Sequence, residues 1–277
     1  MSSGICTEQA PAVALQVSDL SMRFGGLLAV DGVSLSVHER QIVSMIGPNG
    51  AGKTTVFNCL TGFYQPSGGK IMLRGQDITG LPGHQIARRG VVRTFQNVRL
   101  FRGMTAVENL LVAQHRHLKS NMLAGLFKTP GFRQSEKQAL EFAEHWLERM
   151  NLLDVANRSA GTLACGQQRR LEIARCMMTR PSLLMLDEPA AGLNPRETEE
   201  LKELIATLRD EDGMTVLLIE HDMKLVMGIC ERIYVLNYGR VIAHGSPAEI
   251  GKNAEVIAAY LGTPDEEGQG GAQHAED

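Results

Sequence analysis

The stretch from Gln41 to Thr55 constrains the fold of this chain more than any other. It reads QIVSMIGPNGAGKTT, an apolar run of strand length followed by a glycine-rich turn and a predicted helix. Residues 47–54 match the pattern G-x-x-x-x-G-K-[S/T] in the strand–loop–helix context that it requires. In such a loop main-chain N–H groups surround phosphates, Lys53 reaches the terminal phosphates, and the Thr54 hydroxyl can ligate Mg²⁺. This context disfavours a chance glycine-rich turn and predicts a nucleotide-binding α/β core.

A pair of acids ends a second apolar run. LLMLDE, residues 183–188, places Asp187 and Glu188 at the end of a predicted strand. A nucleotide-hydrolysing P-loop protein needs a carboxylate for Mg²⁺ at the end of a neighbouring strand, and Asp187 fills that place. Glu188 follows directly and can accept a proton from an attacking water. The alternative is a polar pair that only terminates the strand, and the loop at 47–54 favours the catalytic interpretation.

Other apolar runs predict the remaining strands. The runs at 42–46, 183–186 and 215–219 are apolar except for Ser44 and Thr215, as in central parallel strands buried on both faces. Further strands are predicted at 13–24, 29–37, 69–75 and 90–96, and a hairpin at 232–245 that turns at 237–239.

Helices are predicted where apolar residues take helical spacing. They begin at Lys53, near Thr105, around Gln134, at Gly166 and at Pro195. The last of these has Asn194 as its N-cap and Glu197 three residues later, and Ser246 and Glu249 form a second capping box. Because helical periodicity replaces the strand pattern between 96 and 161, we predict a helical subdomain inserted into the α/β core.

Charge and composition restrict the class of protein. The chain is 43% hydrophobic and 21% charged, which is ordinary for a globular protein. The net charge is −3, but the last fourteen residues hold five acids and no Lys or Arg, so the first 263 residues carry +2. A nearly neutral body argues against a broad nucleic-acid-binding surface. The acidic, Gly- and Gln-rich tail is expected to be disordered.

Cysteine spacing and apolar run lengths exclude other classes. The five cysteines, Cys6, Cys59, Cys165, Cys176 and Cys230, include no C-x-x-C pair, so reduced thiols are expected rather than a disulfide framework or a zinc site. No basic segment followed by an apolar run begins the chain, so we expect no secretory signal. The longest apolar runs are far below the roughly 20 residues that span a bilayer. We therefore expect any membrane role to come through partners.

The segment LACGQ, residues 163–167, leads into the helix predicted at Gly166. Free N–H groups at such a helix start favour an anion. Apolar residues then recur at helical spacing, with Leu171, Ala174 and Met178 on one face and Ile173 and Met177 on another.

Taken in order, these motifs resemble the ATP-binding-cassette (ABC) family over residues 12–262. The resemblance makes Gln96 of VVRTFQ the Q-loop glutamine, which senses Mg²⁺ and faces the membrane partner, and it places LACGQ at the signature position. Residues 189–194 resemble the loop that joins subunits, and His221 of LLIEHD resembles the switch histidine that contacts the γ-phosphate. Phe24 stands where the family stacks an aromatic ring on adenine.

The resemblance implies that two cassettes pack head to tail. The signature helix of one then closes on the γ-phosphate held by the other, so the phosphate facing residues 163–167 is expected to belong to a partner.

The implied fold is a P-loop NTPase of the ABC ATPase type, α/β, with an antiparallel β subdomain and an inserted α-helical subdomain. The expected boundaries are a flexible N-terminus at 1–11, a nucleotide-binding core with the β subdomain at 12–96 and 162–245, the helical subdomain at 97–161, C-terminal helices at 246–262 and a disordered tail at 263–277.

The resemblance also implies the site residues. Those expected in catalysis are Glu188, His221 and Lys53. Those expected to bind nucleotide are Phe24, Gly47, Pro48, Asn49, Gly50, Ala51, Gly52, Lys53, Thr54, Thr55, Gln96, Leu163, Ala164, Cys165, Gly166 and Gln167. Thr54, Gln96 and Asp187 are expected at the metal.

The signature departs from the usual Leu-Ser-Gly-Gly-Gln at two positions. Ala164 removes a hydroxyl that could cap the helix, worth about 1 kcal/mol, and Cys165 adds a side chain where glycine leaves the backbone open. The subunit-joining loop ends in Asn194 where Asp is usual. Either one half-site of an asymmetric dimer is weakened, or main-chain N–H groups do most of the binding and the changes are tolerated. A reactive Cys165 thiol at the helix start is a third interpretation.

Longer stretches, among them residues 23–35, 90–115 and 219–239, resemble the larger of the two ATPase subunits of bacterial branched-chain amino-acid importers. Such subunits carry an insertion that KSNMLAGLFKTPGFRQ matches near 113–135, and an aromatic residue where this chain has Cys165.

That resemblance implies ATP and Mg²⁺ as cofactors and a peripheral position on the cytoplasmic face of the bacterial inner membrane. The implied partners are two integral-membrane permease subunits, a second and different ATPase, and an extracytoplasmic binding protein that delivers leucine, isoleucine or valine. No nucleic acid is expected.

Residues 97–104 are predicted to line the groove for a permease helix, with burial of Leu100 and Phe101 in the core as the alternative. Three other functions stay open: the ATPase of a related importer or lipid exporter, a soluble ABC ATPase, and a nucleotide-binding module without catalysis. The sequence does not decide between a hetero- and a homodimer.

Overall fold

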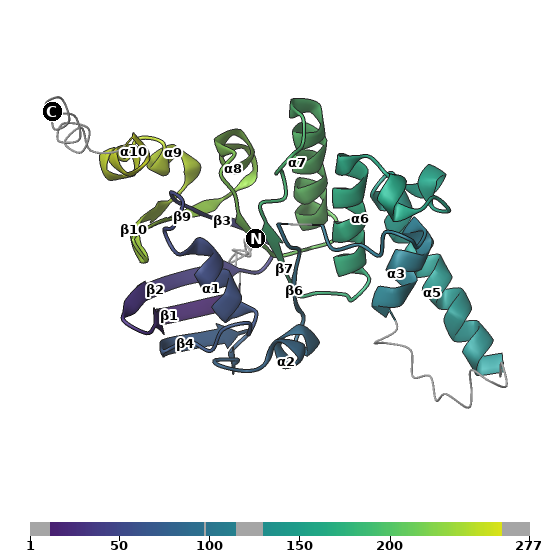
Figure 1. The fold of residues 1–277 in the computed structure, drawn as a ribbon, viewed down its shortest axis with the longest axis horizontal. Coiled ribbons are helices and arrows are strands. Elements are labelled where there is room, and N and C mark those ends of the chain that lie inside the picture. The colour runs from purple at the N-terminus through teal and green to yellow at the C-terminus, as the bar shows by residue number, and fades with distance from the viewer. Residues whose placement is uncertain (1–11, 97, 115–129, 262–277) are drawn as a thin grey trace, which may run out of the picture.

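The computed structural model describes residues 12–96, 98–114 and 130–261 (Figure 1). The predicted flexible N-terminus at 1–11, the tail at 263–277, Cys6 and most of the insertion predicted near 113–135 lie outside the described residues.

A six-stranded sheet occupies the centre of the molecule (Figure 1). Its strand order is β10-β9-β3-β8-β7-β6; the neighbours from β9 to β6 are parallel, and β10 pairs antiparallel with β9. The strands are β3 (Ile42–Ile46), β6 (Val91–Arg93), β7 (Leu183–Asp187), β8 (Val216–Ile219), β9 (Arg232–Asn237) and β10 (Arg240–Gly245).

The central strands separate two hydrophobic cores. All residues of β3, β7 and β8 are buried, and alternate side chains along each strand join opposite cores. In β7, for example, Leu184 and Leu186 face one core while Leu183 and Met185 face the other. Because side chains alternate along a strand, a strand between two cores is apolar at nearly every position; in β3 the one polar residue, Ser44, donates its hydroxyl to the Leu218 carbonyl.

An antiparallel sheet covers one side, with strand order β2-β1-β4-β5. Its strands are β1 (Val13–Phe24), β2 (Leu27–His38), β4 (Gly68–Leu73) and β5 (Gln76–Asp77). Helix α1 (Lys53–Leu60) contributes Val56, Phe57 and Leu60 to the core that this sheet shares with the central sheet, and α2 (Gly83–Arg88) contributes Ile86.

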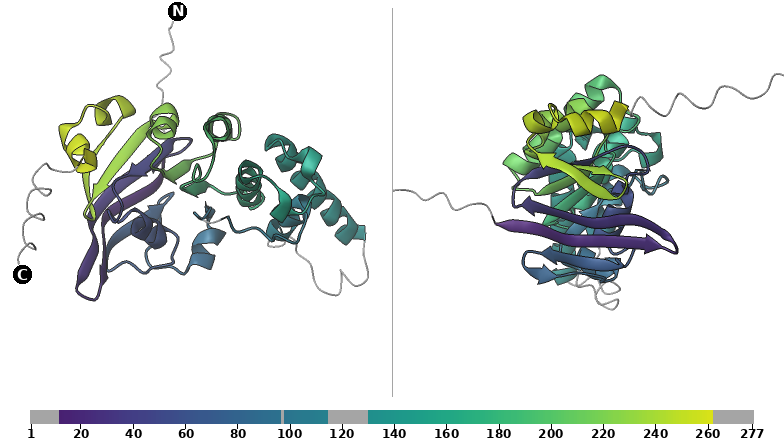
Figure 2. Two further views of the ribbon diagram at one scale, coloured as in Figure 1. Left: turned by 45° about the horizontal axis from the view of Figure 1, so that its top comes forward. Right: turned by 90° about the vertical axis from the view of Figure 1, so that its left-hand side faces the viewer.

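Helices fill the opposite side and one end. Figures 1 and 2 show α3 (Ala106–Gln114) and α5 (Pro130–Arg149) at the end of the molecule away from the antiparallel sheet. Between them and the central sheet lie α6 (Cys165–Met177) and α7 (Pro195–Asp210), and α8 (Met223–Ile229) lies on the other side of α7, above β3 and β9 in Figure 1. Two short 3₁₀ helices, η1 (Leu153–Val155) and η2 (Ala160–Thr162), precede α6, and α9 (Pro247–Ile250) and α10 (Ala254–Leu261) follow β10.

Most predicted elements are confirmed, and the differences have local causes. The strand expected at 90–96 ends at Arg93, because the Thr94 hydroxyl accepts a hydrogen bond from the Asp187 main-chain N–H, 3.3 Å, and the chain turns away. The helix expected at Gly166 begins one residue earlier, and the one expected around Gln134 begins at Pro130. Helices α2 and α8 and the short β5 were not predicted.

Four chain segments meet at one edge of the central sheet. In parallel strands the carboxyl ends lie together, and the register pairs Asp187 with Ile219 and Ile219 with Met45. The loops after β3, β6, β7 and β8 therefore leave from the same edge. No described helix combines the length and apolar character that crossing a bilayer requires.

Candidate active site

The loop after β3 depends on two glycines held against neighbouring backbone. A Cβ atom on Gly47 would lie 2.1 Å from the carbonyl oxygen of Leu236, and one on Gly52 would lie 2.7 Å from that of Ala29. The φ angle of Gly52 is +100°, a left-handed value that side chains disfavour. The loop is thus packed into a cradle that accepts only glycine at these points.

Helix α1 begins directly after this loop with its N–H groups uncapped. Gly52 is the N-cap, it provides no side-chain hydrogen bond, and the first turn contains no acid. The free N–H groups and the helix dipole favour an anion here.

Lys53 lies at the start of α1. Its ammonium donates hydrogen bonds to the carbonyl oxygens of Gly47, 2.6 Å, and Pro48, 2.9 Å. Burial lowers the pKa of Lys53, and the nearby Glu188 carboxylate partly offsets that effect. The cationic group therefore lies inside the loop, close to the acid that ends β7.

A cavity of about 350 Å³ opens over the loop and the helix start. Its lining consists of Leu27–Ala29, Asn49–Thr55, Glu188 and the turn at Tyr238–Gly239. Phe24 is not part of this lining, and its ring packs edge-on against Tyr64 with 5.1 Å between the centroids. Residues 163–167 are also absent from it, and Figure 1 places α6 apart from α1.

The acids that end β7 lie beside the residue predicted from the Q-loop. The Gln96 side-chain amide donates to a carboxylate oxygen of Glu188, 2.8 Å. Glu188 has a φ angle of +46°, which turns the chain sharply at the strand end. Asp187, one residue earlier, is buried. The structure thus brings Lys53, Gln96, Asp187 and Glu188 together at one edge of the sheet.

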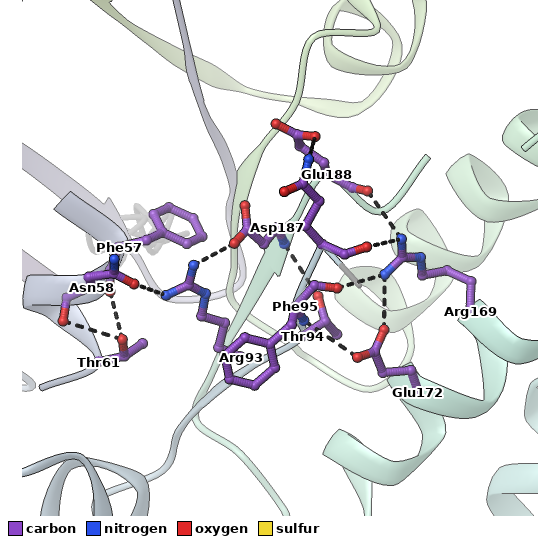
Figure 3. Close-up of polar contacts among 11 residues, drawn as sticks. Phe57, Asn58, Thr61, Arg93, Thr94, Phe95, Arg169, Glu172, Asp187 and Glu188 are labelled. Atoms are coloured by element: carbon purple, nitrogen blue, oxygen red, sulfur yellow. Dashed lines mark hydrogen bonds and ion pairs between the residues drawn. The ribbon is translucent and has the colours of Figure 1, made fainter. Parts of the chain in front are cut away.

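Arg93, the last residue of β6, was not singled out from the sequence. Its guanidinium forms a buried ion pair with Asp187 and donates to the side-chain oxygen of Asn58 on α1, 2.7 Å (Figure 3). The ring centroids of Phe57 and Phe95 lie 5.5 and 5.4 Å from its central carbon. The available signal was a charged residue inside a run predicted as a strand.

A second buried arginine, Arg169 on α6, was also missed. It donates to the Phe95 carbonyl, 2.9 Å, to the Gln96 carbonyl, 3.2 Å, and to the Glu188 carbonyl, 3.4 Å (Figure 3). It also pairs with the Glu172 carboxylate, 2.9 Å, and burial raises the pKa of Glu172 while Arg169 opposes that effect. Arg169 thus joins the helix that follows LACGQ to both segments of the site.

The loop after β8 is organised by Glu220, a third residue that the sequence did not reveal. Its buried carboxylate accepts hydrogen bonds from the main-chain N–H groups of Ala190, 2.7 Å, and His221, 2.9 Å. The His221 side chain remains 66% exposed, with Nδ1 3.9 Å from the Glu220 carboxylate. The predicted switch histidine is thus free to reach a ligand, and Glu220 fixes its backbone.

The start of α6 resembles that of α1. Ala164 is the N-cap and offers no side-chain acceptor, although the Gln167 side chain accepts from its N–H, 3.2 Å. Cys165, predicted in a loop, is the exposed first residue of the helix. By contrast α7 is capped by Asn194, whose side chain accepts from the Glu197 N–H, 3.0 Å, so Asn performs the capping that an Asp would.

The C-terminal helix α10 packs near the phosphate loop. A second cavity, of about 510 Å³, is lined by Pro48–Ala51 on one side and by α10 residues on the other. Burial raises the pKa of Tyr260, and a main-chain hydrogen bond from Gly47 partly offsets that effect.

The segment after Gln96 has a mixed character. Leu100 packs half-buried against the core, as the core alternative predicts, whereas Phe101 is 49% exposed. Asn97, the first residue of the predicted groove, lies outside the described residues.

The donor set suits Mg²⁺ rather than a softer metal. Thr54, Asp187 and Gln96 offer oxygen atoms, and Mg²⁺ takes one or two carboxylate ligands, with phosphates and water completing its shell. Within the described ranges no three His, Cys, Asp or Glu side chains gather into a metal-binding group. The site therefore fits a cation that arrives with a nucleotide.

Comparison with known proteins identifies the family. The profile of the ABC transporter family matches residues 30–191. The chain belongs to the ABC transporter family. A second profile, for branched-chain amino acid ATP-binding cassette transporters, matches residues 240–266 of this ABC cassette.

Relatives of the cassette share most of its length. It is 73% identical to the high-affinity branched-chain amino acid transport ATP-binding protein BraF of Pseudomonas aeruginosa, over 90% of this chain and 97% of that one. It is 67% identical to the high-affinity branched-chain amino acid transport ATP-binding protein LivG of Salmonella typhimurium, again over 90% of this chain and 97% of that one. Among solved structures, the ADP conformation of the ATP-binding cassette MJ1267 matches with a TM-score of 0.79 and 32% identity, over 91% of this chain and 99% of that one.

The ABC ATPase fold is therefore confirmed: a P-loop core with an antiparallel sheet on one side and helices at the far end. As a member of this family, the cassette is an ATP-binding subunit that hydrolyses ATP.

Proposed function

We propose that this cassette is the ATP-hydrolysing subunit of an importer of branched-chain amino acids. The contact that carries the hydrolytic part is the Gln96–Glu188 hydrogen bond, 2.8 Å, at the mouth of a phosphate-binding loop. The transported substrate is inferred from the 73% identity to a branched-chain amino acid transport ATP-binding protein.

In the proposed mechanism, the uncapped N–H groups of α1 and the ammonium of Lys53 bind the phosphates of ATP. Glu188 accepts a proton from a water that attacks the terminal phosphorus, and Gln96 holds that carboxylate in place. His221 and Lys53 stabilise the negative charge that develops on the phosphoryl oxygens. Thr54 and Asp187 would hold Mg²⁺, which would neutralise part of the phosphate charge.

The second half of each site comes from a partner. The uncapped start of α6 offers N–H groups, yet it does not line this chain's own cavity. We infer that it closes on the γ-phosphate of a second cassette, in a dimer of unlike subunits. A related cassette, MJ0796, has been solved in a dimeric structure.

The proposed location is the cytoplasmic face of the bacterial inner membrane, docked on two permease subunits through the segment that includes Leu100 and Phe101. A binding protein outside the membrane would deliver the amino acid to the permease. Extraction in mild detergent should therefore recover this chain with two polytopic proteins and a shorter ATPase. Recovery of this chain alone would favour a soluble ABC ATPase instead.

Replacement of Glu188 by Gln tests the catalytic assignment. The amide keeps the size of the side chain but accepts no proton, so turnover should fall by about 10²- to 10⁴-fold. Binding of a fluorescent ATP analogue should persist. The matched control is Glu199→Gln on the exposed face of α7, where Glu199 forms an ion pair with Lys202. Near-native hydrolysis by the Glu188 variant would refute the proton-accepting role and revive the non-catalytic interpretation.

A further inference from the structure

Asp187 has a protein cation beside it. Its carboxylate pairs with the Arg93 guanidinium, and both side chains are more than nine-tenths buried, at 8% and 7% exposed. Asp187 also accepts nothing else among the hydrogen bonds of the described residues. The residue proposed to hold Mg²⁺ is thus already neutralised by a fixed positive charge.

The geometry keeps Arg93 in this place. Its other terminal nitrogen donates to the Asn58 side chain, 2.7 Å, and the rings of Phe57 and Phe95 lie on either side of the guanidinium. Its Nε is buried without a hydrogen-bond partner. These contacts draw on α1, β6 and the segment after β6, so the side chain is held by several elements and cannot move aside freely (Figure 3).

A guanidinium so placed affects a metal in two ways. It occupies one carboxylate oxygen of Asp187, and it repels any further cation at close range in a site of low dielectric. Burial matters because solvent screens such repulsion only weakly there. In the metal-free protein, a buried Asp187 carboxylate without a counter-charge would destabilise the folded state.

We propose that Arg93 is a built-in counter-cation of Asp187 that Mg²⁺ must outcompete, so that it sets the magnesium concentration at which nucleotide binds. Arg93 is a positioning residue in this role, because it acts through Asp187 and touches no substrate. The inference rests on the proposed function, in which Asp187 serves the metal.

The test is a magnesium titration of nucleotide binding, not of activity. Native protein and the variant Arg93→Gln are each mixed with a ribose-labelled fluorescent ATP analogue, and Mg²⁺ is added until binding saturates. Loss of the positive charge should lower the magnesium midpoint by at least about tenfold. Arg93→Lys keeps the charge, and its midpoint should stay within about threefold of the native value.

The metal-free form gives a second readout. Without Mg²⁺ the Arg93→Gln variant should melt below the native protein, and Mg²⁺ with nucleotide should reduce the difference, because the metal then supplies the missing charge. If that variant does not fold, Asn58→Ala replaces it: loosening the far end of the guanidinium should lower the midpoint to a smaller extent.

The proposal is overturned if the magnesium midpoint of Arg93→Gln is unchanged or is higher than that of the native protein. A higher midpoint would mean that Arg93 orients Asp187 for the metal. If native protein binds nucleotide equally with and without Mg²⁺, the assignment of Asp187 to the metal fails first, and this inference fails with it. A midpoint that falls in the Gln variant but not in the Lys variant supports the proposal.

Discussion

Replacement of Arg169 by Met removes the most connected buried charge of the site. The side chain is 3% exposed, and its partner Glu172 is fully buried. Without Arg169 the Glu172 carboxylate keeps, among the described residues, two long contacts, 3.4 Å each, from the main-chain N–H groups of Phe95 and Arg99. Removing one partner of such a pair costs about 3–5 kcal/mol, because the other charge stays buried and unpaired.

Thermal unfolding measures the expected loss of stability in Arg169→Met. At about 2–4 °C per kcal/mol for a domain of this size, the melting temperature should fall by roughly 6–20 °C. Trp146 is the only tryptophan in the chain and is buried in α5, so its fluorescence reports on unfolding of the helical end, while circular dichroism follows the whole molecule.

Two further variants separate the buried pair from ordinary surface charge. Arg170→Met removes a neighbour that is 19% exposed and pairs with Glu200, which is 38% exposed, so solvent reaches this pair and its loss should change the unfolding free energy by about 1 kcal/mol or less. The double variant with Met at 169 and Leu at 172 should recover about half of the single-variant loss, because no carboxylate is then left unpaired. If the melting temperatures of Arg169→Met and Arg170→Met differ by no more than roughly two or three degrees, the buried Arg169–Glu172 pair is not a major source of stability.

Two predictions concern the nucleotide site itself. Burial lowers the pKa of Lys53, so in alkaline solution the folded protein releases this proton while the unfolded chain keeps it. Between the folded and the unfolded pKa of Lys53, its contribution to stability rises with pH. Nucleotide affinity should fall over the same pH range, because phosphate binding favours the protonated ammonium. Binding should therefore take up a proton, which calorimetry in buffers of different ionisation enthalpy detects. Cys165→Gly should leave the hydrolysis rate of the assembled transporter within about twofold, because main-chain N–H groups at the start of α6 do not depend on that exposed side chain. A several-fold rise would instead support a weakened half-site.

The sequence predicts the parts of the fold that local pattern controls. A strand buried on both faces is apolar at nearly every position, so β3, β7 and β8 are recognisable one by one, with Ser44 in β3 and Asp187 at the end of β7 as their polar residues. The α7 cap is similarly local, since Asn194 and Glu197 are three residues apart and bond each other's backbone. The phosphate loop is predictable for the same reason: strand, glycines and helix follow in order.

The polar framework of the site is not local, and so it was missed. Arg93 and Asp187 are 94 residues apart in sequence, and Arg169 is 73 from the carbonyl of Gln96 that it binds. A charged residue on a helix such as α6 has the same pattern whether it faces solvent or a buried acid. Only the folded chain shows that Glu172 is buried, and only then does its pairing with Arg169 become a requirement.

The bonds of Arg169 to residues 95, 96 and 188 all end on main-chain carbonyl oxygens. Such bonds do not depend on which side chains those positions carry, so substitutions there can alter chemistry or partner contacts and leave the framework intact. The hydrogen bonds of Arg169 to Phe95 and Gln96 do depend on the number of residues that follow β6 in this loop. An inserted or deleted residue between Arg93 and Gln96 would move both carbonyls out of reach. The bonds of Arg169 therefore depend on the length of this loop and not on its side chains.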